Sequence, residues 1–492
     1  MENVAAGSTT ADDHDRGSSW WCCFSRRINQ VITSRDVTAA NPHGGGGGRK
    51  MVSTKTSVER GGGCDVCVEN DDVCQCDHQS GDDGQHRLHE QPNGSFAHAV
   101  INMIGMLIGL GQLSTPYALE NGGWASIFLL LALGLICTYT SHLLGKCLHK
   151  SPKSLSYVDI GHHAFGSKGK LLASTFIYLE IFMALVSYTI SLHDNLATVF
   201  TGTHIPATGV MSTSQLLTLV AVLVALPSLW IRNLSSISFL SSGGILMSGV
   251  IFSCVVFTAA FGGVKPDNNI SVIRARNIPS ISGLYVFSYG GHIVFPDLYK
   301  SMKDPSKFTK VSIVSFAAVT GLYTSMAFLG AKMFGPGVSS QITLSLPPRL
   351  IFTRVALWAT VITPMTKYAL EFAPFAIQVE RTLPCWMSPQ TKTIVRGTVG
   401  SVLLLVILTL ALLVPYFEHV LGLTGSLVST SICVVFPCAF YLKISRGELG
   451  RTVLVLNWAL IGVGCVLGAS GTISSSKLLI NSLRRAHHLH SS

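Results

Sequence analysis

The stretch of sequence that decides the fold reads IGMLIGLGQLSTPYA and runs from Ile104 to Ala118. It lies within an apolar segment, residues 95–119, which can cross a bilayer as one helix because a crossing needs about 20 residues. The stretch nevertheless contains glycines, a proline and polar side chains, which weaken or break a helix. Backbone at membrane depth can leave the helix only where it is buried in protein or lines a water-filled cavity. The sequence therefore predicts that this break frames a binding site, as in a membrane carrier.

The overall composition is that of a polytopic membrane protein. Of the 492 residues, 48% are hydrophobic and 12% are charged, whereas the charged share of soluble domains is about 25%. The formal charge of +10 is dispersed through short connections between apolar segments. This distribution indicates membrane orientation and not binding to nucleic acid. We expect the lipid bilayer as a partner and no nucleic acid.

The chain divides into three regions. Residues 1–93 hold runs of glycine and many polar residues, which cannot bury enough apolar surface to form a core, so we expect a disordered cytosolic tail. Residues 94–472 form the predicted transmembrane domain, an all-α fold with about eleven helices of crossing length. Residues 473–492 are expected to be a short C-terminal tail. The predicted spans are 95–119, 124–147, 170–200, 214–231, 236–262, 279–299, 311–334, 349–380, 396–415, 419–443 and 451–471.

Lysine and arginine residues gather in the even-numbered connections between these spans. Residues 146–170 and 300–310 are the clearest examples, and the odd-numbered connections carry far fewer basic residues. Because positively charged connections stay on the cytosolic side of a membrane, the N-terminal tail is predicted to be cytosolic. An odd number of spans then places the C-terminus on the luminal side.

A second break lies in the sixth predicted span, where the sequence from Phe287 to Asp297 reads FSYGGHIVFPD. The two breaks open the corresponding first spans of two five-span repeats, the pattern of transporters built from inverted repeats. Freed N–H groups at a half-helix N-terminus can bind a substrate carboxylate, and freed carbonyls can hold a cation. The alternative is that the glycines only allow close packing of helices. The predicted substrate-binding residues are Gly109, Leu110, Gly111, Gln112, Ser114, Thr115, Tyr289, Gly290, Gly291 and His292.

These motifs resemble those of the amino acid/auxin permease family. The likeness rests on GLGQLSTPYA at 109–118, SYVDIG at 156–161, DNL at 194–196, GGHIVFPD at 290–297 and TKYAL at 366–370. Together they cover nearly all of the chain from residue 95 to 471, and they are most similar to plant vacuolar amino acid transporters of the vesicular-GABA-transporter-like branch. The resemblance implies an eleven-span, LeuT-like fold with a 5+5 inverted repeat. It also implies proton-coupled secondary transport of neutral amino acids across the vacuolar membrane or another endomembrane rather than the plasma membrane.

Ionisable residues within the spans are candidates for ion coupling, because charges at bilayer depth are costly and are usually functional. Lys367 lies near the middle of the eighth span, beside Thr363. In the LeuT-like fold that the resemblance implies, the cation site lies between the first and eighth spans, so an ammonium at Lys367 can take the place of a sodium ion. The alternative is a static pair with Glu371, one turn further along. Glu180 in the third span is a second candidate, as a proton acceptor.

Other classes of protein are less consistent with the sequence. It carries no signature of a protease, hydrolase or kinase, so we expect neither an enzyme nor a cofactor. Cysteines at 64, 67, 74 and 76 are of the right type for zinc, but their spacing is not that of a zinc site, and we expect no metal. One functional alternative stays open, an amino acid sensor that signals through its N-terminal tail to a cytosolic partner.

Overall fold

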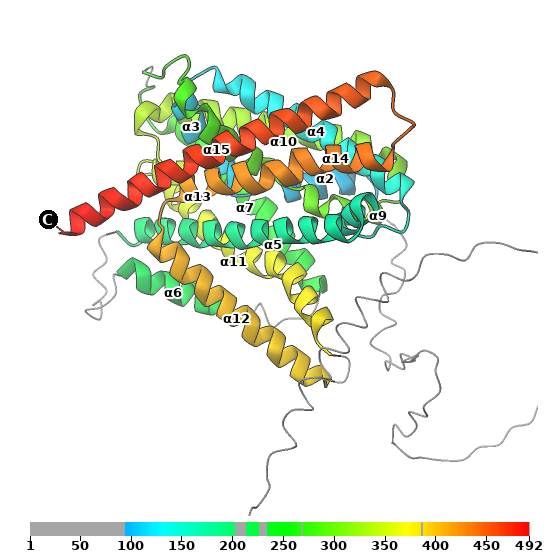
Figure 1. The fold of residues 1–492 in the computed structure, drawn as a ribbon. Coiled ribbons are helices and arrows are strands. Elements are labelled where there is room, and N and C mark those ends of the chain that lie inside the picture. Colours follow the sequence, from blue (N-terminus) through cyan, green and yellow to red (C-terminus); the bar gives the residue numbers. More distant parts are fainter. Residues whose placement is uncertain (1–93, 202–212, 226–233, 267–268, 385–386, 492) are drawn as a thin grey trace, which may run out of the picture. The chain divides into compact units, whose positions relative to one another are not determined.

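The structure is a computed structural model that describes residues 94–201, 213–225, 234–266, 269–384 and 387–491. The predicted tail over residues 1–93 lies outside this part of the chain. The described residues form helices joined by short connections, and they contain no β-strand (Figure 1). The α-helices are α2 (Phe96–Leu107), α3 (Gly111–Gly122), α4 (Ser126–Lys150), α5 (Tyr157–Val199), α6 (Thr213–Ala225), α7 (Leu234–Phe261), α8 (Ile278–Ser288), α9 (Phe295–Ser301), α10 (Phe308–Phe334), α11 (Ile351–Thr382), α12 (Pro389–Leu413), α13 (Phe417–Thr424), α14 (Phe436–Ile444) and α15 (Arg451–Ser491).

The all-α, polytopic fold class predicted from the sequence is confirmed, and each predicted span coincides with a helix or a pair of helices. Within the described residues, seven helices are long and apolar enough to cross a membrane, or eight if the bent pair α2–α3 is one span. The other predicted spans correspond to α6, to the pair α8–α9 and to α11.

One long helix contains a kink, and one helix boundary differs from the predicted one. Helix α5 includes a kink at Phe165 and Gly166, where Gly166 has a φ of 64°. The segment before this kink is therefore a separate short helix, and the predicted third span begins after it. Helix α15 continues to Ser491, well past the predicted end of the last span at residue 471. Figure 1 shows its C-terminal part extending past α13.

Both predicted breaks are present, and they lie directly against each other. Helices α2 and α3 meet at a bend of 58°, where Ile108 is extended. Helix α8 ends at Ser288, and α9 begins only at Phe295, after the short 3-10 turn η3 (His292–Val294). A Cβ atom on Gly111 would lie 2.5 Å from the Cα of Ser288, so only glycine allows the two broken helices to approach this closely.

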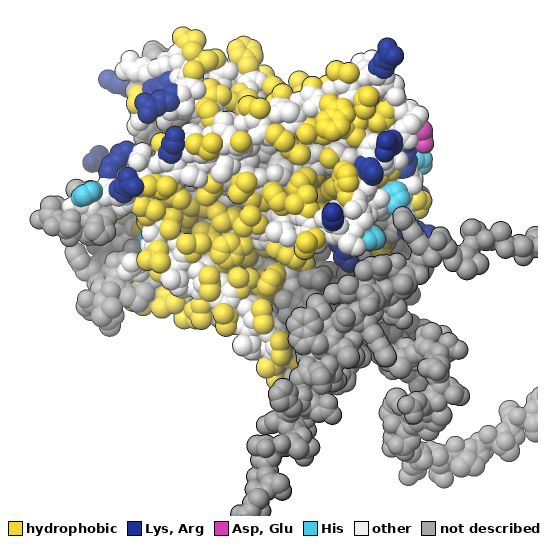
Figure 2. Space-filling view, in the orientation of Figure 1, with side chains coloured by type: hydrophobic (Ala, Val, Ile, Leu, Met, Phe, Trp, Pro, Cys, Tyr) yellow, Lys and Arg dark blue, Asp and Glu magenta, His cyan; other side chains and the backbone are white. Residues whose placement is uncertain are grey.

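The exterior carries a band of exposed apolar side chains of the kind that contacts lipid. Figure 2 shows hydrophobic side chains in a broad band, with lysine and arginine residues gathered toward its two ends. Phe128 and Leu135 of α4, Leu413 of α12 and Val466 of α15 are each at least two thirds exposed. Such extended apolar exposure marks a membrane or partner surface, and the basic residues at its ends fit the two interfaces of a bilayer.

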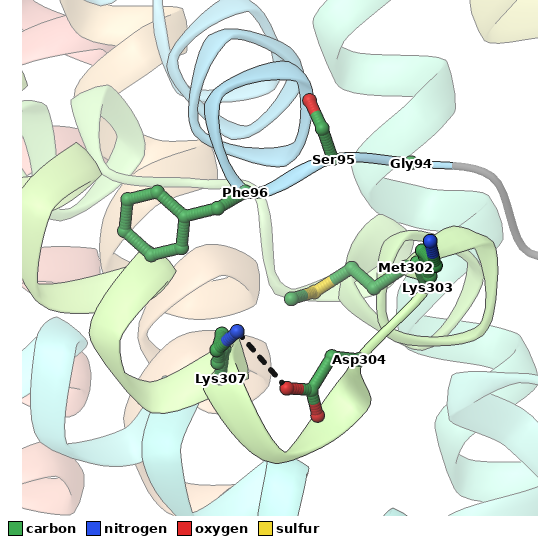
Figure 3. Close-up of a pocket in the computed structure, with 7 residues that line it drawn as sticks. All are labelled: Gly94, Ser95, Phe96, Met302, Lys303, Asp304 and Lys307. Carbon is green, nitrogen blue, oxygen red and sulfur yellow. Dashed lines mark ion pairs between the residues drawn. The ribbon is translucent and has the colours of Figure 1, made fainter.

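The start of α2 is joined to the connection that follows α9. The N–H of Gly94 donates to the Ser301 carbonyl at 3.1 Å, and the N–H of Lys303 donates to the Gly94 carbonyl at 3.0 Å. Around this junction lies an open pocket lined by Gly94, Ser95, Phe96, Met302, Lys303, Asp304 and Lys307 (Figure 3). The first broken span thus begins on the same side of the bundle as the basic connection at residues 300–310, as the charge pattern predicts.

The opposite ends of the two broken spans are also joined. The Arg274 guanidinium lies 2.6 Å from the Glu120 carboxylate at the end of α3. The N–H of Ala125 donates to the Val272 carbonyl at 2.8 Å. The breaks therefore lie between two regions in which the first and sixth spans are joined by hydrogen bonds or ion pairs.

Candidate functional site

A tyrosine from α10 links the two breaks. The Tyr323 hydroxyl lies 2.8 Å from the Leu107 carbonyl and 2.9 Å from the Ser288 carbonyl. Leu107 is the last residue of α2, and Ser288 is the last residue of α8. These carbonyls are freed because the helices end there and no later N–H closes the next turn.

Helix α5 runs past both breaks. The carboxylate Oε1 of Glu180 lies 3.5 Å from the position that a Cβ would take on Gly290 in the second break. The hydroxyl of Tyr188 lies at the same distance from that position on Gly109 in the first break. Glu180 and Tyr188 are about two turns apart on one face of α5, so this face presents a carboxylate and a phenol to the two breaks.

The Glu180 carboxylate is held by a serine from an irregular helix. Ser429 lies in η7 (Gly425–Ser429), a π-helical segment between α13 and α14. Its hydroxyl lies 2.8 and 3.1 Å from the two carboxylate oxygens of Glu180. The wider turn of a π-helix is common at functional sites in helices, and here it sets the serine opposite the carboxylate.

The start of α3 is buried and has no side-chain cap. Leu110 is the N-cap residue, and its side chain makes no capping hydrogen bond. The N–H groups of Gln112 and Leu113 donate to the carbonyls of Gly109 and Leu110 at 3.3 and 3.0 Å. A buried helix N-terminus without a cap is a favourable position for an anionic group.

The predicted polar residues of α3 are buried. Gln112 is 1% exposed, and its side-chain Oε1 has no hydrogen-bond partner among the described residues. The hydroxyls of Ser114 and Thr115 donate to the carbonyls of Gly111 and Gln112 at 3.1 and 3.0 Å. Gln112 is therefore the side chain of α3 with an unused buried acceptor, while the two hydroxyl protons are used within the helix.

A cysteine thiol hydrogen-bonds the backbone at the start of the second half of the sixth span. Cys433, in the π-helical segment η8 (Ser431–Val435), is hydrogen-bonded to the backbone of Gly291 and His292. The backbone groups freed by the second break are therefore in part occupied by the protein itself.

Tyr289 and His292 adjoin the second break in sequence, but their side chains contact α4 and α10. The Tyr289 hydroxyl lies 3.0 Å from the Thr320 hydroxyl of α10. His292 is fully buried, and its Nε2 lies 3.0 Å from the Thr140 hydroxyl and 3.3 Å from the Cys137 carbonyl of α4. A role for these two side chains in selectivity remains a prediction, and the structure places both in contact with neighbouring helices.

The charged candidates of α5 and α11 form one electrostatic cluster. Lys367 is buried, and Glu371, one turn along α11, acts electrostatically on it. The same Glu371 carboxylate also interacts with Glu180 of α5. The Thr363 hydroxyl donates to the Ala359 carbonyl in its own helix at 2.8 Å. Both the coupling role of Lys367 and its static pairing with Glu371 remain consistent with this arrangement.

The DNL motif at the end of α5 forms a hydrogen-bonded network with the connection after α10. The Gln341 side chain donates to Asp194 at 2.9 Å and accepts from Ser191 and Asn195 at 2.6 and 2.8 Å. Thr343, two residues later, donates to Asn195 at 2.8 Å. The network joins this connection to the C-terminal end of α5.

Sequence reasoning missed three side chains near the breaks. They are Tyr188, Tyr323 and Ser429, and each lies in an apolar span without a recognisable motif. The only signal available was the occurrence of a polar group within a membrane span, which has many structural explanations.

The long apolar helices define the class as a multi-pass membrane protein, and two of its spans are broken. Residues 92–477 match the family of transmembrane amino acid transporter proteins. The chain is 61% identical over 429 residues to amino acid transporter AVT1H of Arabidopsis thaliana, covering 86% of this chain and 99% of the relative. It is 36% identical over 395 residues to AVT1E of the same plant, covering 80% and 75%. The chain therefore belongs to the transmembrane amino acid transporter family.

More distant relatives extend beyond plants. The vesicular GABA transporter of Caenorhabditis elegans is 26% identical over 406 residues, covering 80% of this chain and 81% of that protein. Among solved structures, the inward facing conformation of Mhp1 is similar with a TM-score of 0.46 at 13% identity, covering 80% and 91% of the two chains. The similarity to Mhp1 is remote.

Proposed function

We propose that this chain is a secondary active transporter that carries a neutral amino acid and couples its movement to protons. The vacuolar membrane or another endomembrane is its site of action, with the N-terminus cytosolic and the C-terminus luminal. The proposal is supported by the family, by relatives that are named amino acid transporters and by the two adjoining breaks. The sensor alternative depends on the N-terminal tail, which lies outside the described residues.

The uncapped start of α3 is the observation that carries the proposal. The positive end of the helix dipole at this buried start suits a carboxylate, the group common to all amino acids. Gln112 has an unused acceptor in the first turn of this helix, which suits an ammonium group. Gly109 and Gly290 leave space beside Tyr188 and Glu180, because a Cβ at either position would be in contact with these side chains.

Glu180 is the residue that we assign to proton coupling. Its carboxylate lies beside the second break and is held by Ser429 of the π-helical segment. A carboxyl group in this position changes the charge next to the substrate when it binds or releases a proton. Lys367 and Glu371 form the remainder of the charge cluster, so protonation of Glu180 changes the balance of charge between α5 and α11.

The test compares Glu180→Gln with the parent protein in proteoliposomes supplied with a panel of labelled neutral amino acids. Glutamine has the shape of the protonated carboxyl group but cannot release a proton. We expect E180Q to lose uptake that depends on an imposed pH gradient and to retain exchange of internal for external amino acid. Glu448→Gln is the matched control, because Glu448 is an exposed residue paired with Lys150 at the bundle surface.

The outcomes separate the two parts of the proposal. Saturable uptake by the parent and by E448Q, with loss of gradient dependence in E180Q, supports carrier function and the role of Glu180. Gradient-driven uptake by E180Q at the parental rate would contradict its role in coupling. Absence of uptake of every amino acid in the panel by the parent would contradict transport itself.

A further inference from the structure

Tyr323 occupies a position where two partial negative charges meet. The Leu107 carbonyl ends α2, and the Ser288 carbonyl ends α8. The C-terminal end of a helix carries the negative end of its dipole and has carbonyls without intrahelical partners. Two such ends brought together repel each other unless a positive charge or a hydrogen-bond donor lies between them. The sequence predicts that freed carbonyls of this kind can hold a cation.

The donor between them is a single phenolic hydroxyl. Its oxygen lies 2.8 and 2.9 Å from the two carbonyl oxygens, and the backbone of Gly109 also hydrogen-bonds this hydroxyl. A tyrosine has only one hydroxyl proton, so the two carbonyls share it. The hydroxyl thus contacts the backbone of both breaks at once, although Tyr323 itself belongs to neither broken helix.

The tyrosine ring is held rigidly in this position. Tyr323 is fully buried, and its ring centroid lies 5.6 Å from that of Tyr289. Helix α10 itself packs against α2, α3 and α4. The hydroxyl is therefore held in place relative to both broken spans by the packing of α10 and of the tyrosine ring.

We propose that Tyr323 is a positioning residue, whose hydroxyl holds the C-terminal ends of α2 and α8 together and so sets the spacing of the two breaks around the substrate. The inference rests on the proposed function, because it assigns Tyr323 to the same amino acid site. Without the hydroxyl proton, two buried carbonyls lose their shared donor and the half-helix ends separate. The start of α3 and the glycines of the second break then no longer lie at the spacing that a single amino acid spans.

The experiment measures saturable uptake by Tyr323→Phe in proteoliposomes, with the amino acid that the parent takes up fastest from a panel of labelled alanine, glutamine, leucine and tyrosine. Removing the hydroxyl leaves the ring and its packing in place. We expect the KM to rise by about tenfold or more, because loss of a donor to buried carbonyls commonly costs this much. The uptake rates are normalised to the amount of monodisperse protein, so that a lower yield of folded variant is not mistaken for weaker transport.

Tyr285→Phe is the matched control. Tyr285 is also fully buried, and its hydroxyl lies 3.2 Å from the Ser126 hydroxyl, linking α8 to α4 and not to the first break. A purely structural role of the hydroxyl would lower the melting temperature of either variant without raising the KM. We therefore expect Y285F to keep a KM within about twofold of the parent, and Y323F alone to lose apparent affinity.

A second measurement is the rise in melting temperature that the same amino acid produces in each purified protein. We expect the rise in the parent and in Y285F, and a smaller rise at equal concentration in Y323F. A KM of Y323F within twofold of the parent, or an equal ligand-induced rise, would overturn the role of Tyr323. Absence of both uptake and stabilisation in the parent would instead overturn the proposed function.

Discussion

Replacing Gly111 by alanine tests the close approach of the two broken helices. A Cβ at this position would lie 2.4 Å from the Oγ of Ser288, 2.5 Å from its Cα and 2.6 Å from its Cβ. Non-bonded carbon atoms prefer a separation of about 3.5–4.0 Å. The Cα atom belongs to the backbone and cannot rotate away, so the two breaks must separate by about 1 Å or more.

Overpacking of this kind usually costs about 1–3 kcal/mol in stability. Because the strain falls on the two breaks, we also expect Gly111→Ala to reduce transport by the folded protein. Truncating Ser288 to glycine in the same chain removes the contacts with Oγ and Cβ and leaves the Cα at 2.5 Å. The double variant G111A/S288G should therefore recover only part of the loss.

The assay combines melting temperature in detergent with saturable uptake in proteoliposomes. Gly321→Ala is the control, because it lies in the long helix α10 and an added Cβ there would meet nothing within 4 Å. Alanine in a helix is favoured over glycine by about 1 kcal/mol, so G321A should be neutral or slightly stabilising. A G111A protein with parental stability and parental uptake would refute the reasoning that the two breaks are in tight contact.

Three further perturbations have defined outcomes. Lys367→Met should abolish gradient-driven uptake while the protein still folds, if its ammonium takes part in coupling; parental gradient-driven uptake would favour a static pair with Glu371. Gln341→Ala removes two buried hydrogen bonds and one partly buried one and should lower stability by about 1–3 kcal/mol, which an unchanged melting temperature would contradict. Hydrogen bonds from Ser306 and Lys307 hold the pKa of Asp304 below its usual range. The ionised Asp304 carboxylate therefore stabilises the folded protein near neutral pH, and this stabilisation is lost as the pH falls through the lowered pKa. The melting temperature of Asp304→Asn should therefore differ from that of the parent at about pH 7, and this difference should shrink toward about pH 3; a difference independent of pH would argue against the ionised carboxylate as its source.

The sequence was sufficient to predict both breaks, because their signals are local. Glycine and proline within an apolar span interrupt a helix wherever the span lies in the bundle. The positions of the two breaks in the first and sixth spans then follow from the order of spans along the chain. The start of α3 at Gly111 and the end of α8 at Ser288 confirm this part of the prediction.

The side chains around the breaks could not be predicted in the same way. Their directions depend on how helices cross and on backbone angles inside the non-helical segments, which sequence spacing does not determine. Tyr289 and His292 are next to a break in sequence, yet they contact α4 and α10. Tyr188 and Tyr323 are distant in sequence from both breaks, yet tertiary packing places their hydroxyls beside them.

The most direct test of the account is uptake of the labelled amino acid panel by the purified full-length chain in liposomes, with and without an imposed pH gradient. The account predicts saturable uptake of a neutral subset that is accelerated by the gradient and that exchanges with internal amino acid. Uptake that is unaffected by the gradient would contradict proton coupling. A complete lack of saturable uptake, by protein that is folded and correctly inserted, would contradict the central claim that the paired breaks form an amino acid transport site.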